Sequence, residues 1–256
     1  MRDYDVIVIG AGNGGLAAAA TLAEKGKSVI LFERHNIPGG CGTSFRRGRF
    51  EFEIALHQLS HMGTPENPGP LMELFKRYGI YDEIQWIPIK ELFRVNFPDS
   101  TGISLPADRK SCEAHLCREF PHQAQAIGRY FEVVYGFCDQ AAEFAAKSAA
   151  STGEPGALKK AVMKAGFPRL YPLLVKYAMK TTQEVLDEFF TDPKLQLALS
   201  AYWCFMGMPP TRFPFSILAK CTTFYLETKP YYLRGTSMMM NQAIMEAVTR
   251  LGGVVR

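Results

Sequence analysis

The feature of this sequence that most constrains its fold is a glycine motif close to its start. Gly10, Gly12 and Gly15 have the spacing Gly-x-Gly-x-x-Gly, between a β-branched run from Tyr4 to Ile9 and a stretch of strong helix formers closed by Gly26. This strand–turn–helix context predicts a dinucleotide-binding turn. The first glycine allows the tight turn, the second lets the backbone approach a diphosphate, and the third lets helix and strand pack closely.

A second strand and a carboxylate extend this unit. Residues 28–32 form another apolar run, and we expect both runs to be fully buried strands of a parallel sheet. A diphosphate would lie at the helix N-terminus, at Asn13 and Gly14, where free N–H groups and the helix dipole favour negative charge. Glu33 ends the second strand, where its carboxylate can accept hydrogen bonds from ribose hydroxyls. It would repel a 2′-phosphate, which disfavours NADP, although Arg34 weakens that argument. The alternative is a glycine turn that binds no ligand.

The next segment indicates which dinucleotide is bound. Pro38-Gly39-Gly40 follows Glu33 by five residues, and the stretch from Asp5 to Phe45 resembles the FAD-binding N-terminus of phytoene desaturases, carotenoid isomerases and retinol saturases. The wider clan of that family includes the amine oxidases. The resemblance implies FAD as the cofactor, with Gly39 and Gly40 beside its diphosphate and His57 near the flavin. An ordinary turn and an ordinary, partly buried histidine remain the alternatives for these positions.

The resemblance extends along the chain with some departures. Residues 52–55 fall where the family often has Phe-Asp-x-Gly, and residues 182–195 are similar to its helical substrate region. Residues 231–235 are similar to its return to the FAD domain, but Thr236 follows Gly235 where the family usually has a second glycine. The family continues well beyond this point. We therefore expect the chain to be about the N-terminal half of such a protein, incomplete at its C-terminus and lacking a C-terminal half or a partner chain.

These patterns predict an α/β fold of two parts. Residues 1–90 and 231–256 would form a Rossmann-like FAD/NAD(P)-binding domain, and residues 91–230 an inserted, mainly helical substrate domain. The inserted part would open with a β-hairpin, because two short apolar runs flank a turn and cannot join the parallel sheet. We expect a short strand at 49–53, the hairpin strands at 92–97 and 103–105, helices at 71–78, 108–119, 121–149, 181–190 and 238–251, another from Pro193 up to Pro209, a break at 151–156, a turn at 231–237 and a strand from Val254. Asp108 is the predicted N-cap of its helix, and Thr181 with Glu184 has the spacing of a capping box.

Composition and charge limit the classes of protein to which this chain can belong. The chain has 256 residues, 47% hydrophobic, with a net charge of +4, which is ordinary for a globular protein and gives no argument for nucleic acid. Its six cysteines form no Cys-x-x-Cys pair, so we expect reduced, mostly buried thiols in a cytoplasmic protein. The uncharged run from Val6 to Ala23 is no signal peptide, because acidic residues precede it and glycines interrupt it.

Three clusters have alternative readings. His57 and His61 would share a helical face, but no further metal ligand has suitable spacing, so no metal is expected. The arginines at 46, 47 and 49 could face the diphosphate, although a solvated surface is favoured. Residues 158–180 carry many lysines among apolar residues, which suits peripheral contact with an anionic membrane, yet a solvated helix face is the default.

The predicted function follows from the cofactor. We expect an FAD-dependent oxidoreductase acting on C–C bonds of an apolar isoprenoid or polyene substrate, by desaturation, saturation or isomerisation. No catalytic residue is assigned, since the flavin supplies the chemistry and the protein orients the reactants. One alternative is an amine or amino-acid oxidase of the same clan. The other is a partial, non-catalytic chain that needs a partner.

Overall fold

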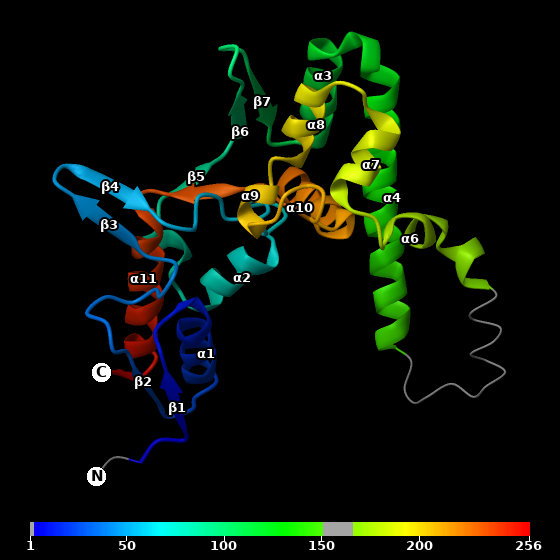
Figure 1. Cartoon of the computed structure of the whole chain (residues 1–256). Coiled ribbons are helices and arrows are strands. Elements are labelled where there is room, and N and C mark those ends of the chain that lie inside the picture. Colours follow the sequence, from blue (N-terminus) through cyan, green and yellow to red (C-terminus); the bar gives the residue numbers. More distant parts are fainter. Residues whose placement is uncertain (1–2, 151–165) are drawn as a thin grey trace. The chain divides into compact units, whose positions relative to one another are not determined.

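The computed structural model describes residues 3–150 and 166–256. It divides into two compact units, one formed by residues 1–89 with 228–256 and the other by residues 90–227 (Figure 1). We call these unit 1 and unit 2. The cofactor role of 1–90 with 231–256 and the substrate role of 91–230 remain predictions.

Unit 1 is built on a three-stranded parallel sheet. Its strands are β1 (Val6–Ile9), β2 (Val29–Phe32) and β9 (Val254–Val255), with β2 in the centre. Helices α1 (Asn13–Glu24) and α11 (Thr236–Arg250) pack against each other and against this sheet (Figure 1). The predicted Rossmann-like α/β arrangement is therefore confirmed, including the short strand at Val254.

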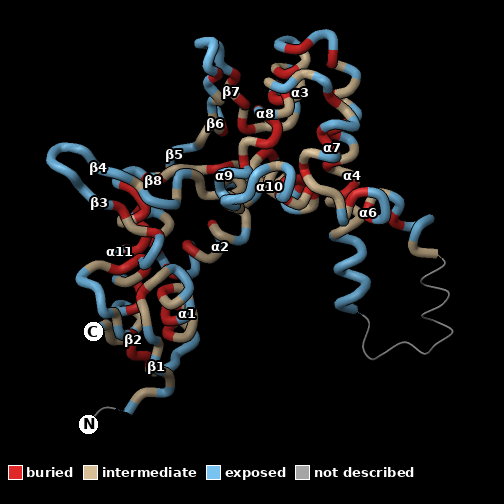
Figure 2. Tube along the Cα trace, viewed as in Figure 1, coloured by how far each residue is buried: buried red, intermediate tan, exposed pale blue. Residues whose placement is uncertain are grey.

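The prediction that the first two strands are fully buried is wrong. Ile7, Ile9 and Phe32 are 63%, 86% and 44% exposed, whereas Val29 and Leu31 are fully buried. Figure 2 colours the residues along the chain by burial. Side chains of a strand point alternately to the two faces of its sheet, and α1 and α11 cover only one of them. We call Ile7, Ile9 and Phe32 the uncovered sheet face.

The rest of unit 1 consists of short elements. Two of them, β3 and β4, form an antiparallel hairpin, of which the sequence predicted only the second strand. The predicted turn at 231–237 is wrong for its first half, because residues 231–233 form a strand paired with residues 86–88. Each of these strands has only three residues, too few for a recognisable sequence pattern, and each is defined by pairing with a partner far away in the sequence. The elements are β3 (Ser44–Arg47), β4 (Phe50–Glu53), α2 (Pro70–Arg77), η1 (Tyr81–Glu83), β5 (Trp86–Pro88) and β8 (Tyr231–Leu233).

Unit 2 is mainly helical, and local signals fix most of its element boundaries. Asp108 caps its first helix by accepting a hydrogen bond from the Ser111 N–H at 2.8 Å, and Thr181 with Glu184 forms the predicted capping box. The hairpin predicted at its start is confirmed. The elements are β6 (Glu91–Asn96), β7 (Gly102–Pro106), α3 (Arg109–Glu119), η2 (Pro121–Gln123), α4 (Ala124–Ala149), α6 (Pro172–Tyr177), α7 (Thr182–Phe189), α8 (Pro193–Ser200), α9 (Trp203–Met206) and α10 (Phe215–Glu227).

Helix α8 of unit 2 is shorter than the sequence predicts. The helix expected from Pro193 up to Pro209 ends at Ser200, and a separate turn of helix follows before Gly207, whose φ is +64°. The apolar sequence between them contains no glycine or proline that would signal the break. The predicted break at 151–156 lies outside the described residues.

Of the segment 158–180, for which membrane contact is predicted, the structure describes residues 166–180. Its first three lysines lie outside the described residues, and Lys176 and Lys180 both pair with Glu188. These pairs neutralise part of the positive charge that an anionic surface would attract. Within the described chain, no helix has the length and apolar character needed to cross a bilayer.

The cysteines are all free thiols, but the prediction that most are buried is wrong. Cys112 is buried, and burial raises the pKa of its thiol to about 12. Cys41 and Cys204 are exposed, and the other three are partly buried.

Candidate functional site

The turn between β1 and α1 has the geometry that its glycines predict. Gly10 adopts φ +95°, and its N–H donates to the Phe32 carbonyl at 2.7 Å. A Cβ on Gly15 would lie 1.9 Å from the carbonyl oxygen of Gly10. Because no side chain can occupy that space, β1 and α1 can approach this closely only with glycine at position 15.

The N-terminus of α1 is open to a ligand. Its N-cap residue is Gly12, in an extended conformation, so no side chain caps the helix, and no acidic residue lies in the first turn. Asn13 and Gly14 follow with exposed surfaces. The free N–H groups and the positive end of the helix dipole therefore point toward a region that an anion can fill.

A second glycine loop lies directly against this turn. The Gly39 N–H donates to the Ala11 carbonyl at 2.6 Å, and Gly12 and Gly39 form an isolated parallel bridge. A Cβ on Gly40 would lie 3.2 Å from the Gly12 Cα. Gly39 and Gly40 adopt φ +115° and +58°. The structure thus brings the two predicted glycine sets into backbone contact.

Glu33 sits beside the same turn. Its carboxylate accepts hydrogen bonds from the His35 N–H at 2.7 Å and the Ala11 N–H at 2.5 Å. These backbone hydrogen bonds hold the pKa of Glu33 below its ordinary value. Each carboxylate oxygen can accept a further hydrogen bond, so the ionised group can still receive ligand hydroxyls. Arg34 follows it with an exposed side chain.

His57 lies in the irregular segment between β4 and α2, and its side chain is exposed. This segment is not helical, so His57 and His61 do not share a helical face. Among the described residues, no group of three His, Cys, Asp or Glu side chains could hold a metal ion. The position of His57 near a flavin remains a prediction.

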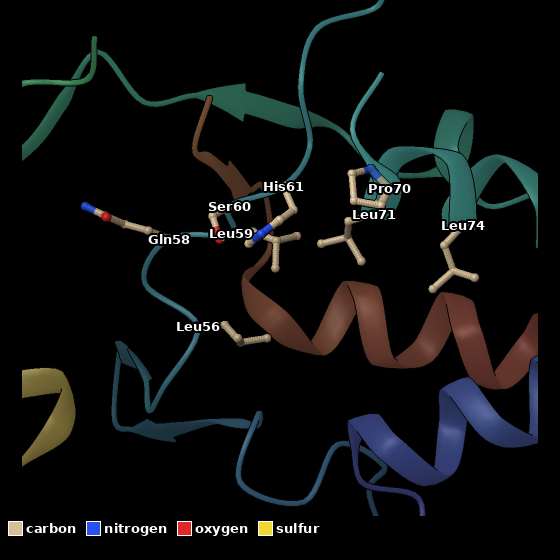
Figure 3. Close-up of a pocket in the computed structure, with 8 residues that line it drawn as sticks. All are labelled: Leu56, Gln58, Leu59, Ser60, His61, Pro70, Leu71 and Leu74. Atoms are coloured by element: carbon tan, nitrogen blue, oxygen red, sulfur yellow. Dashed lines mark hydrogen bonds between the residues drawn. The ribbon is translucent and has the colours of Figure 1, made fainter. Parts of the chain in front are cut away.

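An apolar hollow of about 490 Å³ lies in this irregular segment and the start of α2 (Figure 3). Ser60 and His61 supply polar atoms in its lining, and the Ser60 Oγ lies 2.9 Å from the His61 Nδ1. Its size is within the range of small-molecule pockets. The lining residues are Leu56, Gln58, Leu59, Ser60, His61, Pro70, Leu71 and Leu74.

The arginines of the β3–β4 hairpin lie against the hairpin itself. Arg46 pairs with Glu51 at 3.3 Å, the Arg47 guanidinium lies 5.5 Å from the centre of the Phe45 ring, and Arg49 lies over Phe50. These contacts agree with the favoured reading of an exposed surface.

Sequence reasoning missed a set of contacts from α11. Thr236, Ser237 and Asn241 are buried polar residues that hydrogen-bond to Ser44, Glu53 and Gly42 respectively. In the sequence, these residues are marked only as polar positions on a face of α11 that is otherwise apolar.

Comparisons with known proteins agree with this geometry. Residues 8–78 match a family described as NAD(P)-binding Rossmann-like domain. The chain is 27% identical to all-trans-retinol 13,14-reductase of Rattus norvegicus over 98% of its own length and 40% of that protein. It is 29% identical to the chloroplastic prolycopene isomerase of Daucus carota over 54% of its own length and 21% of that protein. This chain is a relative of both proteins. The resemblance drawn from residues 5–45 is thereby confirmed.

The chain matches only part of each retinol reductase. The chain spans about two fifths of the length of the retinol reductases it matches. Two Danio rerio proteins are each 24% identical to this chain. One is named all-trans-retinol 13,14-reductase and the other inactive all-trans-retinol 13,14-reductase. Overall identity therefore does not separate active from inactive relatives.

Solved structures show the same fold. An oxidoreductase from Methanosarcina mazei superposes with a TM-score of 0.57 at 19% identity, and putrescine oxidase with 0.55 at 17%. Each match covers 98% of this chain and 50% of the other.

Proposed function

We propose that unit 1 binds FAD through its ADP half, and that the whole protein is an FAD-dependent oxidoreductase acting on C–C bonds of an apolar isoprenoid or polyene substrate. The observation that carries this proposal is the backbone contact between the two glycine loops at the open N-terminus of α1, with the Glu33 carboxylate beside them.

The residues fit the proposed group. A Cβ on Gly40 would press on the Gly12 Cα, so the two loops can pack this closely because position 40 is glycine. With no side chain at Gly12 or Gly14, a diphosphate can approach the backbone of the turn. The N–H groups of Asn13, Gly14 and Gly15 would receive its charge. Glu33 would hold the ribose hydroxyls, with the exposed Arg34 beside it. His57 would lie near the flavin, as the family resemblance implies.

The flavin, when bound, supplies hydride transfer to or from a substrate carbon. The protein's contribution is to bind the cofactor, to hold an apolar substrate and to exclude water. The apolar hollow at residues 56–74 suits part of such a substrate. The relatives are named for retinol and prolycopene, which supports a polyene or isoprenoid in preference to an amine. The likeness to putrescine oxidase supports the fold alone.

The uncovered sheet face supports a further part of this proposal. Ile7, Ile9 and Phe32 expose a large apolar surface, and so do Phe45 and Phe52 of the β3–β4 hairpin. Contiguous exposed apolar surface marks interaction sites in soluble proteins. We propose that additional polypeptide covers these surfaces, either as more of the same chain or as a partner chain.

The first test is a cofactor titration of the purified chain. We expect FAD to bind, with ADP competing because both share the half that the glycine loops hold. A Glu33→Ala variant should bind both more weakly by roughly tenfold, the loss of a charge-assisted hydrogen bond. Binding of neither nucleotide by a folded wild-type chain would contradict the cofactor proposal.

The second test separates the functions. The longest natural form of the protein, loaded with FAD and kept free of oxygen, is mixed with polyenes or with amines while the flavin absorbance is followed. Bleaching of the oxidised flavin by a polyene, or reoxidation of the reduced flavin by one, supports the proposal. Bleaching by amines alone favours an oxidase. A stably bound flavin that responds to neither favours a non-catalytic chain, a reading kept open by the relative named inactive.

A further inference from the structure

Helix α11 reaches the second glycine loop through one buried side chain. The Asn241 Nδ2 donates to the Gly42 carbonyl at 2.6 Å, and Asn241 is fully buried. A Cβ on Gly39 would lie 2.1 Å from this same Nδ2. The Asn241 amide therefore packs directly on Gly39 and holds the loop at its other end, Gly42.

The orientation of this amide is determined by its surroundings. Rotation by 180° would place the amide oxygen against the Gly42 carbonyl oxygen, which is repulsive, so the donor must face Gly42. The Asn241 Oδ1 is buried without a hydrogen-bond partner among the described residues. An unpaired buried amide oxygen is unfavourable, so an apolar residue would serve stability better here if stability alone mattered.

Two neighbouring residues hold the hairpin that follows the loop. The Ser237 N–H and Oγ–H both donate to the Glu53 carboxylate at 2.7 Å, and the Thr236 and Ser44 hydroxyl oxygens lie 2.9 Å apart. Thr236 adopts φ +69°, a left-handed conformation that is costly for a β-branched residue. Backbone strain of this kind clusters at ligand-binding sites.

We propose that Asn241 is a positioning residue of the dinucleotide site: its amide fixes the Gly39–Gly42 loop against Gly12, and so determines how tightly a diphosphate is held. Thr236 and Ser237 anchor the same helix to the hairpin beyond the loop. This inference rests on the proposed function of unit 1. It adds a residue that lies about 200 positions from the loop it serves.

The test compares nucleotide affinity in variants of the full chain. Asn241→Ala should raise the dissociation constants of FAD and ADP about fivefold to tenfold, the loss of one hydrogen bond that orders the loop. The affinity for adenosine, which lacks the diphosphate, should not change. Gln242→Ala is the matched control, because it removes an amide from the next residue, which is exposed and bonds only to Glu246 among the described residues.

A second variant, Asn241→Asp, allows the hydrogen bond to Gly42 to be switched on and off by pH in a single protein. Asn241→Asp keeps the side-chain size, and its buried carboxyl should have a raised pKa. When protonated it can donate to the Gly42 carbonyl, and when ionised it repels that carbonyl. FAD affinity, relative to wild type at the same pH, should therefore be near normal at low pH and fall as the pH rises through that pKa.

The outcomes separate the two proposals. If the wild-type chain binds neither nucleotide, the proposed function fails and this inference fails with it. If the wild type binds both, and the two Asn241 variants bind them equally well at every pH, the positioning role alone is overturned. Equal weakening of adenosine and ADP would also overturn it, because that result indicates general loss of structure.

Discussion

The two units differ in how their cores are built and in where apolar side chains remain exposed. Unit 2 packs α4 against α3, α6 and α10, and its core contains many buried aromatic side chains, such as Tyr130, Phe131 and Phe215. Unit 1 covers one face of its sheet and leaves Ile7 and Ile9 on the other face in solvent. Unit 2 also leaves apolar side chains in solvent, such as Leu170 and Met179. The units therefore differ in where the exposed apolar surface lies: on a sheet face and a hairpin in unit 1, and around helices in unit 2. Because Trp86 lies in unit 1 and Trp203 in unit 2, single-tryptophan variants can follow the units separately.

The largest expected contrast concerns glycines in helices. Gly15→Ala should destabilise unit 1 by about 3 kcal/mol, because the new Cβ overlaps the Gly10 carbonyl. Gly128→Ala in α4 of unit 2 meets no atom within 4 Å and should stabilise by about 0.5–1 kcal/mol. Urea unfolding followed by Trp86 and Trp203 fluorescence measures both. Equal effects in the two units would contradict the close approach at Gly15.

A second contrast concerns buried tyrosine hydroxyls. The Tyr78 hydroxyl of unit 1 donates to the Ala17 carbonyl at 3.0 Å and lies 2.7 Å from the Thr21 hydroxyl oxygen. That of Tyr130 in unit 2 is buried without a partner among the described residues. Tyr78→Phe should therefore cost about 1 kcal/mol, while Tyr130→Phe should gain about 1 kcal/mol. The two unfolding free energies should move in opposite directions, and a loss of stability in Tyr130→Phe would show that its hydroxyl is paired.

The third prediction concerns acid stability. Hydrogen bonds from His35 and Ala11 lower the pKa of Glu33 below its ordinary value of 4.5. Its ionised form therefore stabilises unit 1 above that pH, and the stabilisation is lost as the pH falls through the lowered, folded-state pKa. In Glu33→Gln, the unfolding free energy of unit 1, followed by Trp86 fluorescence, should depend less on pH in the acid range. The pH dependence reported by Trp203 serves as the control and should not change.

The smallest effect on stability is expected at the uncovered sheet face. Ile9 is 86% exposed, so Ile9→Ser should change the unfolding free energy by less than about 0.5 kcal/mol. It should nevertheless reduce self-association of the isolated chain, measured by light scattering, because it removes apolar surface. The contrasting variant is Leu31→Ser in the same sheet, where the side chain is fully buried and the loss should reach several kcal/mol.

Sequence reasoning succeeded where structure depends on neighbours in the chain. The Gly10–Gly15 turn, the Asp108 cap and the Thr181 capping box each follow from a few adjacent residues, and the structure has all three. The conformations of Gly39 and Gly40 could be predicted in the same way, because only glycine readily adopts their backbone angles.

The remaining features depend on residues far apart in sequence. The pairing of residues 86–88 with 231–233 joins two segments too short to be recognised, and the contact of Asn241 with Gly42 crosses almost the whole chain. The exposure of Ile9 depends on what covers the sheet, which the strand's own sequence does not state. A β-branched run specifies a strand, but not how many of its faces are buried.

The composition of unit 1 from both ends of the sequence affects how the protein is made. Residues 1–89 leave the ribosome first, but strand β9 and helix α11 follow only after all of unit 2. At ~5–20 residues per second, that interval lasts on the order of ten seconds. During it, β2 lacks its β9 neighbour and the Gly39–Gly42 loop lacks Asn241. The proposed nucleotide site is therefore completed only after unit 2, which interrupts unit 1 in the sequence, has had time to fold.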